Sequence, residues 1–317
     1  MSSLSRRRFV ALAGSGLGAT LLSACSLAHA VERPEVEALA AAIPSPTPTP
    51  RPIPPRSKER MFLLPGTEWE AEGIAIHSGQ AGPRIMVIGG VHGNEPGGWE
   101  AAEAIAKWQV ERGSLLVFPR LNWRSAAVME RTLTGFGDLN RLYPGNPTST
   151  LPMARVAAAV IEAGRAFGPE LLFDLHESWV FYQERGSNSG TAFIGQTVSV
   201  GGGADDAAID RISDVVRAVN AAITPREEFF IRGAARPRPG IQLVPANPTP
   251  TPGGPRPSAT PPNGVTFNGT SSLSLGQWIP GCVPILIEMG QRDQAEARRS
   301  ELHQMLVRTT LDQSGML

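Results

Sequence analysis

The sequence predicts a single α/β domain built on a mixed, largely parallel β-sheet that is flanked by helices. Two observations support this prediction. Short apolar runs of strand length alternate along the chain with amphipathic stretches of helical length, which is the pattern of α/β folds. The 317 residues, of which 41% are hydrophobic and 18% charged, have the composition of a globular protein with length for one or two domains.

The N-terminal segment, residues 1–25, is predicted to be a twin-arginine export signal that ends in a lipobox. It contains Ser5-Arg6-Arg7-Arg8, then an apolar run too short to span a bilayer. The run ends in Leu22-Ser23-Ala24-Cys25, which resembles the lipobox of bacterial lipoproteins and implies acylation of Cys25. Signal cleavage after Ala30 is the alternative. In both cases the mature protein is expected outside the cytoplasm, anchored to the membrane or secreted.

Two proline-rich runs divide the remaining chain. The first lies within residues 26–59, which we interpret as a semi-rigid spacer, because such a sequence cannot bury a core. The second, residues 245–264, is interpreted as a surface insertion without catalytic chemistry. The folded domain is therefore predicted to cover residues 60–317.

Within this domain the elements are expected to alternate. Strands are predicted near Met61 and over residues 73–76, 85–88, 115–118, 171–175, 191–194 and 284–288. Helices are predicted over residues 99–112, 153–167, 205–223 and 293–311. In open α/β sheets, ligands bind beyond the carboxyl ends of the strands. Side chains suited to binding a metal follow or end three of these strands: His92, Glu95, His176 and Glu288.

The loop after the strand at residues 85–88 is the first candidate metal site. His92 and Glu95 lie three positions apart between that strand and the following helix, so an imidazole and a carboxylate fall close together. Both suit Zn²⁺, whose catalytic sites take three protein ligands and leave one position open. His176 supplies a third ligand at a later strand end. Asp174 projects to the same face as His176, since strand side chains alternate, and is expected to orient it or to help shape the site.

Charge and cysteine content narrow the classes of function. Twenty-nine basic and 29 acidic residues give a formal charge of zero, so no nucleic-acid partner is expected. Cys282 is the only cysteine besides Cys25. If Cys25 is acylated, Cys282 therefore has no partner for a disulfide within the chain. It precedes an apolar run, and buried packing is its expected role.

Together these motifs resemble the zinc carboxypeptidase clan, and within it the succinylglutamate desuccinylase/aspartoacylase family. The resemblance covers roughly residues 84–290 and rests on motifs in the family's order: His92-x-x-Glu95, Asp138-Leu139-Asn140-Arg141, Asp174-Leu175-His176 and a late strand ending in Glu288. It implies a zinc carboxypeptidase-like fold with one Zn²⁺ per chain, held by His92, Glu95 and His176.

The resemblance also implies roles for other residues. Glu288 would be the general base, and Arg131 would polarise the scissile carbonyl. Asn140 and Arg141 would bind a substrate carboxylate, with Asp138 bracing their loop. The sequence departs from the family where Asn122-Trp123 replaces Asn-Pro, which leaves the shape of the substrate pocket open. Glu177 is expected to be a solvated neighbour of the site.

The function expected from these features is zinc-dependent hydrolysis of an amide bond adjacent to a carboxylate. An N-acyl amino acid deacylase, a carboxypeptidase and a peptidoglycan-peptide amidase all fit, with a small-molecule or peptide substrate that bears a carboxylate. The alternative is a membrane-tethered binding lipoprotein that keeps the fold without catalysis. The sequence does not indicate the oligomeric state.

Overall fold

The computed structural model describes residues 51–184, 191–201, 204–233 and 271–317. The predicted export signal with Cys25 and the predicted insertion at residues 245–264 lie outside these described residues. None of the helices in the described part of the chain combines the length and the apolar character needed to cross a bilayer.

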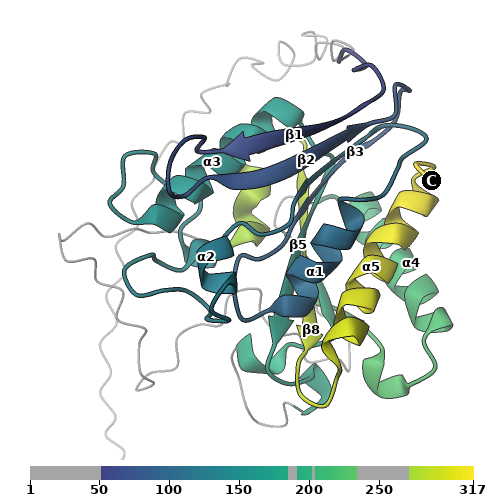
Figure 1. Ribbon diagram of the computed structural model, residues 1–317. Helices are drawn as coiled ribbons and strands as arrows, with labels where there is room; N and C mark the ends of the chain where they lie inside the picture. Colours follow the sequence, from purple (N-terminus) through teal and green to yellow (C-terminus); the bar gives the residue numbers. More distant parts are fainter. Residues whose placement is uncertain (1–50, 185–190, 202–203, 234–270) are drawn as a thin grey trace, which may run out of the picture. The chain divides into compact units, whose positions relative to one another are not determined.

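One eight-stranded sheet forms the centre of the fold, with the order β1-β2-β4-β3-β5-β8-β6-β7 (Figure 1). The pairs β4–β3, β3–β5, β5–β8 and β6–β7 are parallel, and the pairs β1–β2, β2–β4 and β6–β8 are antiparallel. The sheet is therefore mixed with a parallel centre, which confirms the predicted fold class. Its strands are β1 (Ser57–Leu63), β2 (Ala71–His77), β3 (Arg84–Ile88), β4 (Ser114–Phe118), β5 (Leu171–Ser178), β6 (Thr197–Val200), β7 (Ile231–Gly233) and β8 (Val283–Gly290).

Helices cover both faces of this sheet. α1, α4 and α5 lie on one face and α3 lies on the other (Figure 1). The α-helices are α1 (Pro96–Ile105), α2 (Trp123–Ala126), α3 (Pro152–Phe167), α4 (Asp206–Ala222) and α5 (Glu296–Gln313). Short 3₁₀ helices are η1 (Leu139–Arg141), η2 (Tyr182–Glu184), η3 (Thr191–Phe193), η4 (Arg226–Glu228) and η5 (Ser272–Gln277).

Local sequence signals explain where the helices begin and end. Pro96 and Pro152 stand in the first turns of α1 and α3, where the missing N–H costs no hydrogen bond. Gly168 caps the C-terminus of α3, and its φ of 63° is in the left-handed region that glycine adopts readily. The Asp205 carboxylate caps α4 by accepting a hydrogen bond from the N–H of Ala208 at 2.7 Å.

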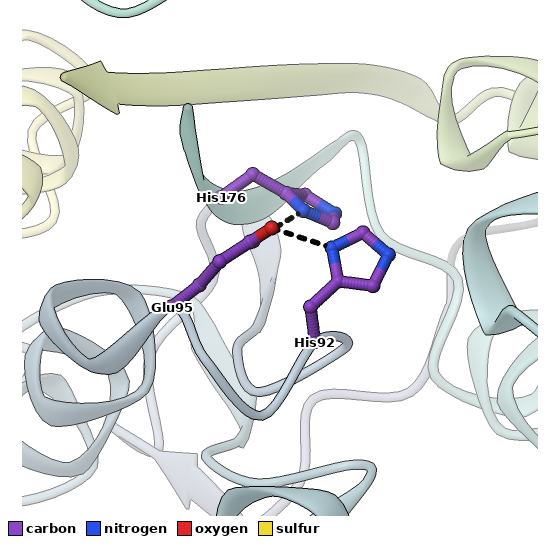
Figure 2. A group of neighbouring side chains, drawn as sticks. All are labelled: His92, Glu95 and His176. Carbon is purple, nitrogen blue, oxygen red and sulfur yellow. Dashed lines mark hydrogen bonds and ion pairs between the residues drawn. The ribbon is translucent and has the colours of Figure 1, made fainter. Parts of the chain in front are cut away.

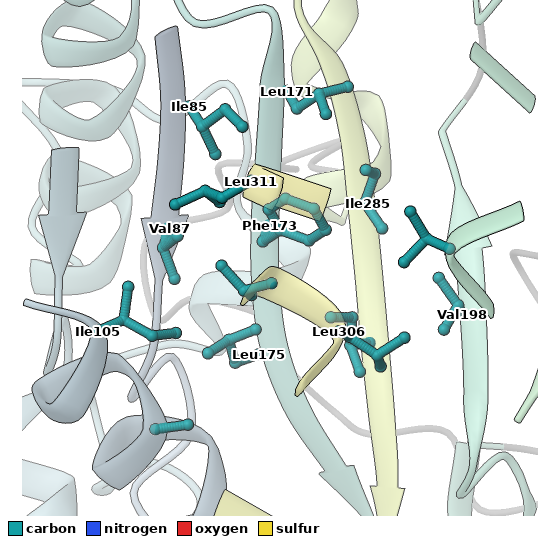
Figure 3. Close-up of a cluster of buried hydrophobic side chains, with 14 of the residues drawn as sticks. Ile85, Val87, Ile105, Leu171, Phe173, Leu175, Val198, Ile285, Leu306 and Leu311 are labelled. Atoms are coloured by element: carbon teal, nitrogen blue, oxygen red, sulfur yellow. The ribbon is translucent and has the colours of Figure 1, made fainter. Parts of the chain in front are cut away.

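The apolar core has one layer on each face of the sheet. On the α1/α4/α5 face, Val87, Phe173 and Ile285 of the strands pack against helix residues such as Leu306 and Leu311 (Figure 3). On the α3 face, a second cluster includes the strand residues Met86, Leu116 and Leu172 and the helix residues Val156 and Val160. Since both faces are covered, β3, β4, β5 and β8 are almost completely buried, and polar groups on them need partners.

Three expectations differ from the structure. β1 begins at Ser57, so residues 57–59 pair with β2 instead of belonging to the spacer. The helix expected over 99–112 ends at Ile105, and Glu111 instead donates its N–H to the Met316 carbonyl at 2.8 Å. The strand expected over 191–194 is the 3₁₀ helix η3, and the neighbouring strand β6 begins after Gln196, whose φ is +62°.

The buried thiol of Cys282 provides a test of this core. Cys282 is 6% exposed, and burial raises the pKa of its thiol to about 12. In a Cys25→Ser variant we expect Cys282 to react with a thiol-specific disulfide reagent at least about 100-fold more slowly in the native protein than in denaturant, because the thiolate is the reactive form. Equal rates in the two conditions would contradict the buried position.

Candidate metal centre

The loop between β3 and α1 carries His92 and Glu95 and is pressed closely against α2. Gly93 lies between the two side chains, and a Cβ at this position would come within 2.2 Å of the carbonyl carbon of Ser125. The N–H of Gly93 donates to the Arg131 carbonyl at 3.2 Å. A glycine at residue 93 therefore allows the loop to approach α2, which fixes the path of the backbone through both candidate ligands.

His92, Glu95 and His176 converge in one buried cluster (Figure 2). The Nδ1 atom of His92 lies 2.7 Å from Glu95 Oε1, and the Nδ1 atom of His176 lies 2.7 Å from Glu95 Oε2. The potential ligand atoms of the three residues all lie within 4.8 Å of one another. The structure thus brings together the three residues that the sequence nominates as metal ligands.

A second carboxylate contacts the Nε2 atom of each imidazole, on the side of the ring away from Glu95. His92 Nε2 lies 3.0 Å from Asp138 Oδ1, and His176 Nε2 lies 2.8 Å from Asp174 Oδ2. Such carboxylate–histidine pairs orient metal-ligating imidazoles and select the tautomer that leaves the other nitrogen free to ligate. The sequence prediction that Asp174 orients His176 agrees with this contact.

The contacts of Asp138 with His92 and of Asp174 with His176 determine which imidazole nitrogens are free to bind a metal ion. A neutral imidazole that donates its Nε2–H to a carboxylate presents the lone pair of Nδ1 on its other side. In this site both Nδ1 atoms face oxygens of the Glu95 carboxylate, and lone pairs repel one another unless a proton or a cation lies between them. Two imidazole nitrogens and one carboxylate oxygen are a ligand set of catalytic Zn²⁺ sites. The residues present therefore fit a zinc ion.

The charges of the cluster shift the acidity of its members. Burial alone would raise the pKa of Glu95, but the imidazoles of His92 and His176 lower it below its usual range. Burial also opposes ionisation of Asp138, whose pKa is nevertheless lowered by its hydrogen bond with His92 and by the nearby Arg131 guanidinium. Both carboxylates are thus held in the ionised form that binds cations.

Glu288 lies beside His176 on the neighbouring strand. The two residues are register partners in the parallel pair β5–β8, so their side chains project to the same face of the sheet. Burial raises the pKa of Glu288 to about 8, and the Glu95 and Asp174 carboxylates add to the shift, whereas His176 and Arg131 oppose it. This is the behaviour of a carboxyl group that can exchange a proton near neutral pH.

Arg131 enters the site from the loop that follows α2. Its guanidinium donates to Asp138 Oδ2 through Nη2 at 3.0 Å, and Nη1 lies 3.4 Å from Glu95 Oε1. Arg131 is half-buried, so its guanidinium contacts the cluster and remains partly accessible.

The two residues predicted to bind a substrate carboxylate occupy different environments. Asn140 is buried, with Nδ2 3.4 Å from His176 Nε2, and its Oδ1 accepts the N–H of Ser272 at 2.8 Å. Arg141 is exposed and donates from Nη1 to the Asn140 carbonyl at 2.7 Å. The substrate-binding role of both residues stays a prediction.

Two contacts near the site were not apparent from the sequence. Asp138 braces its own loop as expected, by accepting the N–H of Asn140 at 3.0 Å, but it also orients His92. Glu177 is not the solvated neighbour that the sequence suggested, because its carboxylate is buried and accepts a hydrogen bond from Arg299 Nε at 2.8 Å. An arginine on the C-terminal helix has no local sequence relation to Glu177 that would reveal this pair.

The contact between Asp174 and His176 yields a prediction. Replacing Asp174 by Asn should weaken Zn²⁺ binding about 10-fold to 100-fold, because the imidazole loses its charged partner. The dissociation constant is measured by competition with a metal-sensitive chelator. An Asp214→Asn variant, changed at an exposed aspartate of α4, is the control. Equal affinities of the two variants would show that Asp174 does not support the ligand.

Residues 81–180 match the family model described as the succinylglutamate desuccinylase/aspartoacylase catalytic domain. No curated protein sequence matches the chain.

Several solved structures share the fold at low identity. The product-bound ectoine utilization protein EutE (DoeB) from Ruegeria pomeroyi is 17% identical with a TM-score of 0.54, and the match covers 84% of this chain and 70% of that one. A succinylglutamate desuccinylase/aspartoacylase from Rhodobacter sphaeroides is 14% identical with a TM-score of 0.52, covering 84% and 68%. Tripeptide-bound cell shape determinant Csd4 from Helicobacter pylori is 14% identical with a TM-score of 0.55, covering 78% and 56%.

The solved structures show the fold, and the family model matches one segment of it. The chain spans little more than half the length of the Csd4 chains that it matches. The matched residues 81–180 include His92, Glu95 and His176. The segment that carries all three candidate ligands is therefore matched by the succinylglutamate desuccinylase/aspartoacylase catalytic domain, and the described residues have the α/β fold of its solved structures.

Proposed function

We propose that this protein is a zinc-dependent hydrolase that cleaves an amide bond adjacent to a carboxylate. One observation carries the proposal. The Nδ1 atoms of His92 and His176 converge on Glu95, while Asp138 and Asp174 hold the opposite nitrogens. Three ligands with oriented imidazoles and a buried acid beside them are the components of a metallohydrolase site.

Zinc bound by His92, Glu95 and His176 would supply Lewis acidity, which lowers the pKa of water to about 7 and polarises a carbonyl. Glu288 would act as the general base that accepts a proton from the attacking water and then donates it to the leaving nitrogen. Its position beside His176 and its raised pKa suit a group that must both take up and release a proton. The Arg131 guanidinium would stabilise the negative charge that develops on the carbonyl oxygen.

Arg141 and Asn140 would recognise the substrate carboxylate. Arg141 is exposed and adjacent to the buried Asn140, and a guanidinium matches a carboxylate in two-pronged geometry. We favour N-acyl amino acids, peptides and cell-wall peptides as substrate classes. The tripeptide-bound Csd4 and product-bound EutE structures are consistent with a small-molecule or peptide substrate.

The first test combines a substrate panel with a Glu288→Gln variant. The wild-type protein should hydrolyse one class among N-acyl amino acids, C-terminal dipeptides and muropeptides, and a chelator should abolish the reaction. Glu288→Gln should keep one zinc per chain, because Glu288 is not a proposed ligand, but kcat should fall about 100-fold or more. Glu162→Gln, at an exposed site on α3, is the control.

The outcomes separate the two readings of the fold. Stoichiometric zinc without turnover on any class would favour the alternative, a catalytically silent binding lipoprotein. Unchanged kcat in Glu288→Gln would exclude Glu288 as the base.

We also propose that the mature protein is a lipoprotein outside the cytoplasm, exported by the twin-arginine route and anchored through Cys25. The proposal rests on the Arg6-Arg7-Arg8 start and the Leu22–Cys25 segment. In a bacterial host, a labelled fatty acid should be incorporated into the wild type and not into Cys25→Ser. Label in the Cys25→Ser protein would overturn the anchor, and a mature N-terminus after Ala30 would indicate secretion.

A further inference from the structure

We propose that Glu177 and Arg299 form a positioning pair that holds the metal ligands in place from the opposite face of the sheet. The inference rests on the proposed function, in which His92, Glu95 and His176 bind a metal ion. It assigns a role to a buried ion pair that takes no part in the proposed chemistry. Neither residue is proposed to touch the metal or the substrate.

Strand alternation explains how the pair reaches the site. Glu177 follows His176 directly on β5, so its side chain projects to the other face of the sheet, towards α1 and α5. There its carboxylate is fully buried and accepts hydrogen bonds from Arg299 Nε at 2.8 Å and from Gln291 Nε2 at 2.9 Å. Arg299 lies in the first turns of α5, and its own side chain is 9% exposed.

The same residues contact the ligand loop at two points. The backbone N–H of Glu177 donates to Glu95 Oε2 at 3.1 Å, the oxygen that also faces His176 Nδ1. Gln291 Nε2 donates to the carbonyl of Asn94, the residue before Glu95, at 2.8 Å. The Glu177 carboxylate, Gln291 and Arg299 therefore fix both the end of β5 behind His176 and the loop that carries Glu95.

Close packing leaves this arrangement little freedom. A Cβ added to Gly97, in the first turn of α1, would lie 2.2 Å from Glu177 Oε1 and 2.7 Å from Arg299 Cβ. The pair thus occupies space that any side chain at residue 97 would need. Because α1 starts directly after Glu95, the ligand loop, α1 and the ion pair form one tightly packed unit.

The cost of burying charges indicates that the Glu177–Arg299 ion pair has a role beyond stabilising the fold. Removing two charges from water is costly, and apolar residues of similar volume often replace a buried ion pair with no loss of stability. A metal site, in contrast, requires its ligands to be held within about 0.5 Å, and the groups behind the ligands commonly set metal affinity. The backbone N–H of Glu177 reaches Glu95 directly, and Gln291, which also donates to the Glu177 carboxylate, reaches Asn94, so the pair is connected to the ligand loop as that requirement demands.

The test measures metal binding rather than activity. Zn²⁺ alone is titrated into the metal-free full chain against a competing chelator, and thermal unfolding is followed in parallel. Arg299→Met should raise the dissociation constant about 10-fold to 100-fold, and Arg299→Lys, which keeps a positive charge, should recover part of the affinity. The visible spectrum of bound Co²⁺ should also change in Arg299→Met, since it reports ligand geometry.

The adjacent arginine provides a matched control, and a double variant distinguishes a positioning role from a purely structural one. Arg298→Met changes the adjacent arginine, which pairs with Glu228 and Glu301, and should leave the dissociation constant unchanged. The double variant Glu177→Leu/Arg299→Met replaces the ion pair by apolar side chains. It should recover thermal stability without recovering zinc affinity, which a purely structural role would not produce.

Each outcome decides the inference. Wild-type affinity in a folded Arg299→Met protein, or in the double variant, would overturn the positioning role. If Arg299→Met does not fold, Glu177→Gln, which keeps the size of the side chain, provides the same decision. A wild-type chain that binds no zinc would instead overturn the proposed function itself, and with it this inference.

Discussion

Repulsion among carboxylates that are buried or, for Asp138, partly buried is the constraint on which the rest of this structure depends. Glu95, Asp138, Asp174 and Glu288 are gathered around two imidazoles, and like charges so placed are tolerated only with compensating positive charge. Arg131 supplies part of that compensation through its contacts with Asp138 and Glu95. A divalent cation between the histidine Nδ1 atoms would supply the remainder, so the electrostatics of the site and its proposed chemistry have the same origin.

Near this cluster, the two faces of the sheet carry different kinds of side chain. On β5, Asp174 and His176 project towards the site, whereas Phe173 and Leu175 project into the apolar layer under α1 and α5 (Figure 3). Packing in the apolar layer holds β5 in place, and the position of β5 determines where the Asp174 and His176 side chains point. This division explains why a strand that is buried along its whole length carries alternating polar and apolar residues near its carboxyl end.

The candidate ligands could be predicted from the sequence because strand ends and loops can be recognised locally. His92, Glu95, His176 and Glu288 each follow or end an apolar run, and parallel strands bring such positions to one edge. Prediction from the sequence failed where a distant contact decides the structure. Glu177 appeared solvated because its partner Arg299 lies 122 residues further along the chain. The short strand β6 was misplaced because a turn at Gln196, rather than the apolar run before it, determines where pairing with β8 begins.

The spacing of the candidate ligands would link metal binding to the order of folding. His92 and Glu95 share one loop, but His176 lies 81 residues beyond Glu95 and reaches it only after β5 has paired with β3. Of the three candidate ligands, an unfolded chain would therefore keep only His92 and Glu95 close together, and the proposed site would form only in the assembled sheet. A metal ion held there would favour the native state by mass action, by about 2.7 kcal/mol at a hundredfold excess over its dissociation constant. The supply of metal during folding would then influence how much of the chain persists in its native form.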